Sequence, residues 1–376
     1  MTVHRIPAVF MRGGTSKALM FRAQDLPADR AERDAIFLAA MGVPDPNGRQ
    51  LDGMGGGLSS LNKVCIVGAP SRPDADVDYT FVQLGVEQAL VDYGGNCGNM
   101  SSAIGPFALE EGLIPAPADG EATVRIHNTN TGKIIVARFP VEDGMLAADG
   151  DFALDGVAGT AAPIKLEFVE PGGAKTGKLL PTGAPTDWLD VPGLGRIEAS
   201  CVDAANPCVF VAAADLGLTG TELPTALERD QAFLARMEAI RQAASVAMGL
   251  AADLAAARQL ASIPKVAVVA APQDAPTLSE RVLAAGEMDI AVRMISVGQP
   301  HRAVPITGAV CLAIAARLPG TIPHRLCASA VGPMRIGHPS GTILVDANVA
   351  DGKALNGAVF RSARRLFEGN VVFRAP

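Results

Sequence analysis

Paired cysteines, zinc-binding patterns and nucleotide-binding loops are absent from this sequence of 376 residues. Its six cysteines contain no CxxC pair, and no His/Cys cluster has the spacing of a zinc site. A Ser-His-Asp spacing and a dinucleotide-binding fingerprint are missing as well. We therefore expect a reduced, cytoplasmic protein that has no metal site. The six cysteines are Cys65, Cys97, Cys201, Cys208, Cys311 and Cys327.

Long hydrophobic runs are also missing. Residues 1–7 contain no apolar signal core, and the most hydrophobic windows, 265–272 and 306–318, are too short to span a bilayer. The net charge is -7 and the basic residues are dispersed, so neither nucleic acid nor a membrane is an expected partner. The length and a hydrophobic content of 49% suit about two domains, each with its own core.

Glycine-rich loops are what the chain has in their place. The most prominent, residues 92–102, contains Cys97 and leads into a helical-looking apolar run. A helix that begins near Asn99 would place Cys97 at its positive end, which favours a thiolate or a bound carboxylate. Pro106 would kink that helix or mark the first turn of a second one. A loop with a buried structural cysteine is the alternative interpretation.

Two further loops precede possible functional groups. Residues 12–17 lie between two short apolar runs and lack the GxxxxGK[ST] spacing, so a nucleotide site is not expected. This loop could hold a carboxylate through amide, hydroxyl and ammonium donors, or it could be an ordinary hairpin turn. Residues 52–62 lead to Lys63 at the start of an apolar strand. Partial burial would favour the neutral amine of Lys63, which can act as a base; a surface lysine is the alternative.

The remaining pattern predicts a mixed α/β chain. In its second half, a polar loop at residues 299–311 leads into an apolar helix that ends at Leu318. The cysteine loop of the first half likewise leads into an apolar helix of its own. This similarity suggests a pseudo-repeat. His338, in a turn before a strand, is either a ligand group or a structural histidine. We expect a helix at 28–42 and a long helical region from about 225 to 260. Strands are expected at 8–11, 18–21, 64–67, 121–127, 134–139, 196–203, 208–213, 265–270 and 342–345, with a final pair of strands in the tail around 358–369.

Glycine-rich loops with one lysine, one cysteine and several hydroxyls suit proton abstraction next to a carboxylate. Four of these segments, residues 11–17, 52–56, 95–99 and 337–341, resemble the motifs of the PrpF family, and the resemblance covers nearly the whole chain in order. That family includes 2-methylaconitate cis-trans isomerase, 4-oxalomesaconate tautomerase, methylitaconate delta-isomerase and aconitate delta-isomerase.

The resemblance implies an α/β (α+β) fold like that of diaminopimelate epimerase. Two pseudo-symmetric domains, 1–188 and 189–376, would each wrap a curved, mostly antiparallel sheet around a central helix. The two central helices would follow Cys97 and Thr307, the terminal strands can return to the first domain, and the active site would lie in the cleft between the domains.

The resemblance also implies a cofactor-independent isomerase. Lys63 would act as the general base in a 1,3-allylic proton transfer that moves the C=C bond of an unsaturated di- or tricarboxylate. Cys97 would be a second acid/base or a wall of the site. A homodimer is the expected assembly, and no partner other than the small-molecule substrate is implied. The substrate-binding candidates are Thr15, Ser16, Met54, Gly55, Asn96, Gly98, Asn99, His301, Thr307, His338, Ser340 and Gly341.

Two departures from the family pattern stand out. Asn62 occupies the position before the lysine, where the family usually has serine or threonine, which puts a hydroxyl contact beside Lys63 in question. Ala18 replaces a glycine that often follows the lysine of the first loop.

Two other functions stay open at this point. One is a two-base racemase or epimerase, which would need a second cysteine where residues 307–309 stand, although Cys311 is one turn further on. The other is a non-catalytic accessory protein of a methylcitrate-type pathway.

Overall fold

The computed structural model describes residues 2–93, 96–115, 117–260, 263–296, 298–329 and 331–375, so Gly94 and Gly95 of the cysteine loop lie outside the described residues. Contacts group the chain into two units, unit 1 (1–167 and 360–376) and unit 2 (168–359). The sequence places the division later, at 188/189. The structure assigns the segment after 168 to unit 2 because its backbone is tied to Asp203, whose carboxylate accepts hydrogen bonds from the amides of Lys175 and Thr176.

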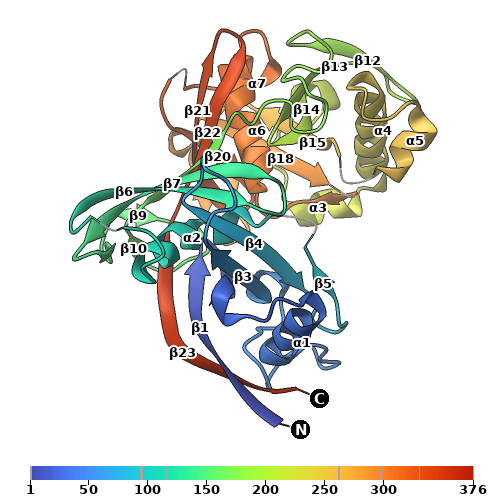
Figure 1. Ribbon diagram of the computed structural model, residues 1–376. Helices are drawn as coiled ribbons and strands as arrows, with labels where there is room; N and C mark the ends of the chain where they lie inside the picture. Colours follow the sequence, from blue (N-terminus) through green and yellow to red (C-terminus); the bar gives the residue numbers. More distant parts are fainter. Residues whose placement is uncertain are drawn as a thin grey trace. The chain divides into compact units, whose positions relative to one another are not determined.

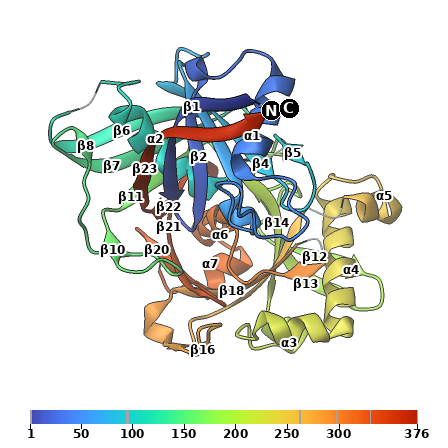
Figure 2. The same cartoon turned by 90° about the horizontal axis from the view of Figure 1, so that it is seen from below.

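Unit 1 is a sheet with a helix on each face (Figures 1 and 2). Its helices are α1 (Arg30–Met41) and α2 (Gly98–Glu110). Its strands are β1 (Thr2–Gly13), β2 (Ser16–Arg22), β3 (Lys63–Gly68), β4 (Val77–Leu84), β5 (Val91–Asp92), β6 (Gly120–Asn128), β7 (Lys133–Glu142), β8 (Met145–Leu146), β9 (Phe152–Ala153), β10 (Thr160–Ala161), β11 (Ile164–Val169) and β23 (Ala363–Ala375).

Side chains alternate across the strands of unit 1, as the pleat requires. On β3, Val64 and Ile66 join the core cluster that includes Phe37 of α1. Lys63 and Cys65 therefore point to the opposite face, against which α2 packs. The predicted helix at 28–42 is confirmed as α1, which begins after the N-cap Asp29 and ends at Gly42 in the left-handed conformation.

Unit 2 has the same kind of layers. Its helices are α3 (Pro224–Arg229), α4 (Gln231–Ala247), α5 (Leu254–Gln259), α6 (Ile306–Arg317) and α7 (Ile322–Leu326). Its strands are β12 (Asp187–Val191), β13 (Gly195–Ala204), β14 (Asn206–Ala212), β15 (Lys265–Ala270), β16 (Ala275–Pro276), β17 (Val282–Leu283), β18 (Ile290–Ser296), β19 (Gln299–Pro300), β20 (Met334–His338), β21 (Gly341–Ala350) and β22 (Lys353–Arg361). The last two residues of β22, Phe360 and Arg361, belong to unit 1.

The helical region expected at 225–260 is confirmed, and it consists of three helices, α3, α4 and α5. Asp230 and Asp253 interrupt it: each has an extended backbone, and its carboxylate caps the helix that follows by accepting an amide hydrogen bond. Pro106, by contrast, lies inside one continuous helix, α2, and does not start a second one. Within the described residues, no helix is both long and apolar enough to cross a membrane.

The two units pair their strands in the same order. In unit 1 the neighbours run β23, β1, β2, β3, β4, β6, β7, and in unit 2 they run β12, β13, β14, β15, β18, β20, β21. The six successive pairings are antiparallel, antiparallel, parallel, antiparallel, parallel and antiparallel in both units. α2 and α6 occupy equivalent places in this order, so the pseudo-repeat suggested by the sequence is present in the topology.

The central helices of the two units are buried on all sides. Every residue from Met100 to Leu109 of α2 is buried, as is every residue from Gly308 to Ala316 of α6. A helix that is apolar all round belongs in a core, and both helices pack against several strands of their own unit. Glycine permits this approach: a Cβ on Gly105 would come within 2.7 Å of the Phe139 ring.

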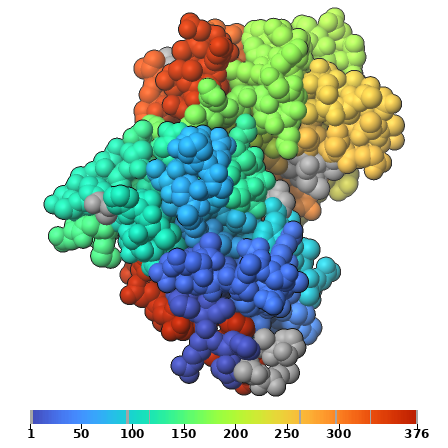
Figure 3. Space-filling view, viewed as in Figure 1, coloured from blue at the N-terminus to red at the C-terminus, as the bar shows by residue number. Residues whose placement is uncertain are grey.

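The ends of the chain meet in unit 1. β1 and β23 pair antiparallel from Thr2 opposite Ala375 to Gly13 opposite Ala363. The first and last strands therefore lie side by side at the surface, dark blue against red in Figure 3, and the two termini are adjacent in Figure 2. The last strand thereby brings residues from the end of the sequence into the unit that contains Lys63 and Cys97.

Candidate active site

Lys63 is the first residue of β3, and it is only 7% exposed. Its Nζ donates a hydrogen bond of 2.5 Å to Oε1 of Gln83, on the neighbouring strand β4, and lies 5.1 Å from the centre of the Phe81 ring. None of the ion pairs among the described residues includes Lys63. The amine is thus buried against polar and aromatic neighbours on β4. The surface-lysine interpretation is therefore wrong.

Gln83 fixes the position of this amine. While its Oε1 accepts from Lys63, its Nε2 lies 3.1 Å from the backbone oxygens of Ser59, Asn62 and Leu84. The side-chain amide is thus held by the loop that precedes β3 and by its own strand. Gln83 was not among the residues predicted from the sequence, because only the register of β3 against β4 places it opposite Lys63.

Asn62, the residue that departs from the family pattern, is fully buried. Its Oδ1 accepts a hydrogen bond of 2.8 Å from Gln50, and its Nδ2 donates to the backbone oxygen of Gly85. Gln50 in turn donates to the backbone oxygen of Met41 at 2.9 Å. The side chain of Asn62 is therefore an internal tie between the glycine-rich loop and the end of β4.

Cys97 is the N-cap residue of α2 and is half-buried, and its side chain makes no capping hydrogen bond. Burial raises the pKa of Cys65, two residues after Lys63 on the same face of β3; the nearby Cys97 raises it further, and the charge of Lys63 lowers it. Lys63 and Cys97 therefore both lie within electrostatic reach of one buried thiol. Both predicted catalytic residues lie in unit 1, on the side of β3 that α2 covers.

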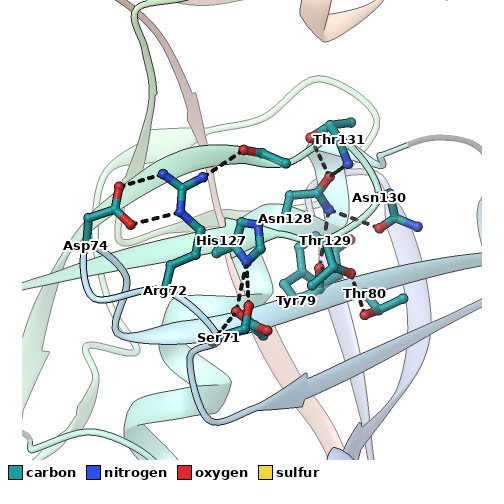
Figure 4. A network of polar contacts seen from close by, with 12 residues as sticks. Ser71, Arg72, Asp74, Tyr79, Thr80, His127, Asn128, Thr129, Asn130 and Thr131 are labelled. Atoms are coloured by element: carbon teal, nitrogen blue, oxygen red, sulfur yellow. Dashed lines mark hydrogen bonds and ion pairs between the residues drawn. The ribbon is translucent and has the colours of Figure 1, made fainter.

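A polar network surrounds the turn that joins β6 to β7 (Figure 4), and it extends through Asn128 to Asn96, just before α2. Asn128, fully buried, donates to Asn130 at 3.1 Å and to Asn96 at 3.4 Å. Asn130 donates to the backbone oxygens of Phe81 and Tyr93. The network thereby connects β4, the cysteine loop and the β6–β7 turn, and it fixes the loop that carries Cys97.

The first loop lies beside the same helix end. Residues 12–17 form the β1–β2 hairpin, as the simpler interpretation held, with Gly13 paired to Ser16. Thr15 accepts a hydrogen bond of 3.1 Å from Nδ2 of Asn99, the second residue of α2, and Ser16 is buried. Gly14 has a φ of 52° and lies so close that a Cβ there would be 2.3 Å from Oδ1 of Asn99. Thr15, Ser16, Gly98 and Asn99 are thus brought together with Cys97.

Met54 and Gly55, unlike the residues at the start of α2, lie against the end of α1. Their backbone amides already donate to the carbonyls of Ala40 and Met41, at the end of α1. A Cβ on Gly55 would come within 2.2 Å of the Gln50 side chain, so glycine is required there for packing. In this structure their amides are used by the protein itself.

The predicted binding residues of the second half lie in unit 2. Burial and the charge of Lys265 lower the pKa of His301 to about 4, so His301 is neutral at physiological pH. Its Nε2 is buried and has no partner among the described residues. Ser340 donates through Oγ to the backbone oxygen of Arg302, and its amide donates to Nδ1 of His338. Thr307 is the second residue of α6, and Gly341 begins β21.

Of two pairs of equivalent positions in the units, one has the same residue type in both units and the other does not. Lys265 begins β15 as Lys63 begins β3, since the two strands hold the same place in the pairing order. The N-cap of α6 is Pro305, whereas that of α2 is Cys97. Cys311 is fully buried inside α6, with its Sγ 3.5 Å from the backbone oxygen of Val202. Unit 2 therefore has no cysteine at the position equivalent to Cys97.

Arg361, like Gln83, was not among the site residues predicted from the sequence. The last residue of β22, it is 6% exposed and donates from Nε to Oδ1 of Asn99 at 3.0 Å. The sequence predicts a final pair of strands in this tail, but it does not show where the tail goes. Across the described residues, no group of three or more His, Cys, Asp or Glu side chains could hold a metal ion.

Comparison with known proteins decides the family. The PrpF protein family matches residues 3–374. The chain belongs to the PrpF family. It is 41% identical to the 2-methyl-aconitate isomerase of Shewanella oneidensis, over 98% of this chain and 96% of the relative. The crystal structure of methylitaconate-delta-isomerase superposes with a TM-score of 0.92 at 42% identity, covering 99% of this chain and 96% of that one.

The fold class predicted from the sequence is confirmed for this PrpF chain. A hydroxyproline epimerase from Agrobacterium vitis, with 14% identity and a TM-score of 0.50, covers 99% of this chain and 94% of its own and shares the fold. The predicted enzyme class, an isomerase, is confirmed as well, because PrpF relatives similar along nearly their whole length are isomerases.

Proposed function

We propose that this PrpF protein moves the C=C bond of an unsaturated di- or tricarboxylate by a 1,3-allylic proton transfer, with Lys63 as the general base. The observation that carries the proposal is the buried amine of Lys63, which is held by Gln83, has no carboxylate partner and shares a face of unit 1 with Cys65 and the start of α2. Relatives named 2-methyl-aconitate isomerase and methylitaconate-delta-isomerase support this substrate class.

The chemistry follows from the position of the amine. Neutral Lys63 removes a proton from the allylic carbon, and the electron pair shifts into the conjugated carboxylate to give a dienolate. The ammonium of Lys63 then returns the proton to the other end of the allyl system, so the double bond moves and the lysine is regenerated. Amides at the start of α2 stabilise the negative charge that develops on the carboxylate. This scheme needs no cofactor, and Cys97 serves as a wall of the site or as a second proton donor.

The location, the assembly and the alternative chemistry are separate points of the proposal. All six cysteines are free thiols, which suits a reducing, cytoplasmic location. The homodimer remains a prediction. The two-base racemase is disfavoured, because Pro305 stands where unit 2 would need a cysteine to match Cys97.

The test is turnover in heavy water. We would follow 2-methylaconitate, methylitaconate, the aconitate isomers and 4-oxalomesaconate by proton NMR with the purified wild-type chain. We expect one of them to isomerise and to take up deuterium at the allylic carbon. Lys63→Met should reduce turnover by about 100- to 10,000-fold with an unchanged circular dichroism spectrum.

Lys133→Met, at an exposed lysine of the same unit, is the matched control and should be fully active. A fully active Lys63→Met would remove the base from the mechanism. No exchange with any of these acids by the wild type, together with a stable complex with a pathway enzyme on gel filtration, would favour the accessory protein.

A further inference from the structure

A buried cation stands at the start of α2 without a carboxylate partner. Arg361 is 6% exposed, yet none of the ion pairs among the described residues includes it. Burial lowers the pKa of Arg361 to about 10, so the guanidinium is still charged at neutral pH. Arginines that are buried in proteins are normally paired, because removing a charge from water costs several kcal/mol per ion. The charge of Arg361 therefore calls for an anion that the described part of the chain does not supply as a carboxylate.

The hydrogen bonds of Arg361 leave one nitrogen of its guanidinium, Nη2, available to a ligand. Nε donates to Oδ1 of Asn99 at 3.0 Å, and Nη1 donates to the backbone oxygen of Phe360 at 2.8 Å. Among the described residues Nη2 has no acceptor. Gly14 covers the stem of the side chain, since a Cβ there would lie 3.2 Å from Cδ of Arg361. The guanidinium is thus held in one orientation before any ligand binds.

The groups around it favour an anion. α2 has 13 residues and begins at Gly98, and the first amides of a helix have no acceptor within the helix. The N-cap side chain, Cys97, does not bond to any of them. The thiol of Cys97 lies within electrostatic reach of Arg361 as well. The guanidinium of Arg361, which has no carboxylate partner, is therefore bonded to Asn99 in the first turn of α2, beside the free amides of that helix.

We propose that Arg361 and the first amides of α2 bind one carboxylate of the substrate, which makes Arg361 a substrate-binding residue of this enzyme. The inference rests on the proposed function and adds the charge that fixes the substrate beside Cys97. Thr15 takes part indirectly, because it accepts from Asn99 and so keeps Oδ1 of Asn99 turned toward Arg361.

The test uses tricarballylate, a saturated tricarboxylate that has no allylic double bond and cannot be isomerised. Its binding to the full chain is measured by isothermal titration calorimetry. We expect wild type and Lys63→Met to bind it similarly, and Arg361→Gln to bind it about 10- to 100-fold more weakly, because a charged hydrogen bond is lost. With the active substrate, Arg361→Gln should raise KM by a similar factor and leave kcat within about threefold. Arg364→Gln, at the exposed arginine three residues on, is the matched control and should change neither.

Each outcome decides between alternatives. Arg361→Lys keeps the charge and guards against a folding defect; we expect intermediate affinity with an unchanged thermal midpoint. Tricarballylate affinity within twofold of wild type in Arg361→Gln, together with a fall in kcat, would overturn the proposal and assign Arg361 to the Cys97 thiol. Failure of the wild type to bind tricarballylate at millimolar concentration would also overturn it. Binding through Arg361 without turnover of any unsaturated acid would leave the subsite standing and refute the isomerase.

Discussion

Replacing Asn62 by serine tests whether this residue acts on the substrate or on the fold. The family resemblance implies serine or threonine before the lysine, so the substitution places a hydroxyl beside Lys63. If the hydroxyl contacts the substrate in relatives, the variant should change KM. The structure leads to a different expectation, because Asn62 is fully buried and bonds only to the protein.

The magnitude follows from the bonds that serine cannot make. The shorter side chain cannot reach both Gln50 and the Gly85 carbonyl, so at least one hydrogen bond is lost, at about 0.5–1.5 kcal/mol. The buried group left without a partner costs about 1–3 kcal/mol more. Gln50 is spared part of this loss because it keeps the Met41 carbonyl. We therefore expect Asn62→Ser to lower the free energy of unfolding by about 2–4 kcal/mol.

The assay pairs stability with kinetics. Thermal unfolding followed by circular dichroism should show a midpoint lowered by about 3–5 °C, while KM at 25 °C stays within twofold of wild type. Asn370→Ser is the matched control, since Asn370 is exposed on β23 and its loss should cost less than about 0.5 kcal/mol. A variant with wild-type stability and a changed KM would refute the reasoning and assign Asn62 to the substrate.

Two further predictions concern the positioning of Lys63 and the acid stability of unit 2. Gln83→Leu removes the side chain that accepts the hydrogen bond of Lys63. In steady-state kinetics we expect kcat to fall about tenfold while KM stays within twofold of wild type. Gln88→Leu, at an exposed glutamine, is the control and should change neither. His301 has a pKa of about 4 in the fold against 6.5 in the unfolded chain, so it stabilises the fold above pH 6.5 and this stability is lost as the pH falls toward 4. In urea titrations, the advantage of wild type over His301→Asn should shrink by about 1–2 kcal/mol between pH 7 and pH 4, after a discount for the partial exposure of the ring; a constant difference would contradict the buried, neutral histidine.

Local features of this fold could be predicted from the sequence because neighbouring residues determine them. The helix at 28–42 has an aspartate cap and a terminal glycine, and the strand after Lys63 is a short apolar run. The glycine beside Cys97 and the small residues of α2 likewise indicate a buried helix end. The break at Asp230 was missed, since an alanine-rich region reads as helix unless the capping role of the aspartate is recognised.

The site itself depends on pairings that no local pattern contains. Gln83 meets Lys63 only through the register of β3 against β4, and Arg361 meets Asn99 only because the end of the chain returns to α2. The burial of Asn62 was also invisible, because its partner Gln50 lies twelve residues away in a loop.

The pairing of β1 with β23 also has a consequence for how the chain folds as it is made. Unit 2 is one uninterrupted segment, 168–359, whereas unit 1 contains both ends of the chain. During synthesis β1 is made before β23, and the edge of β1 that pairs with β23 stays open until β23 has left the exit tunnel. Such an open edge can pair with wrong partners. Unit 1, which contains Lys63, can therefore be completed only after all of unit 2 has been synthesised.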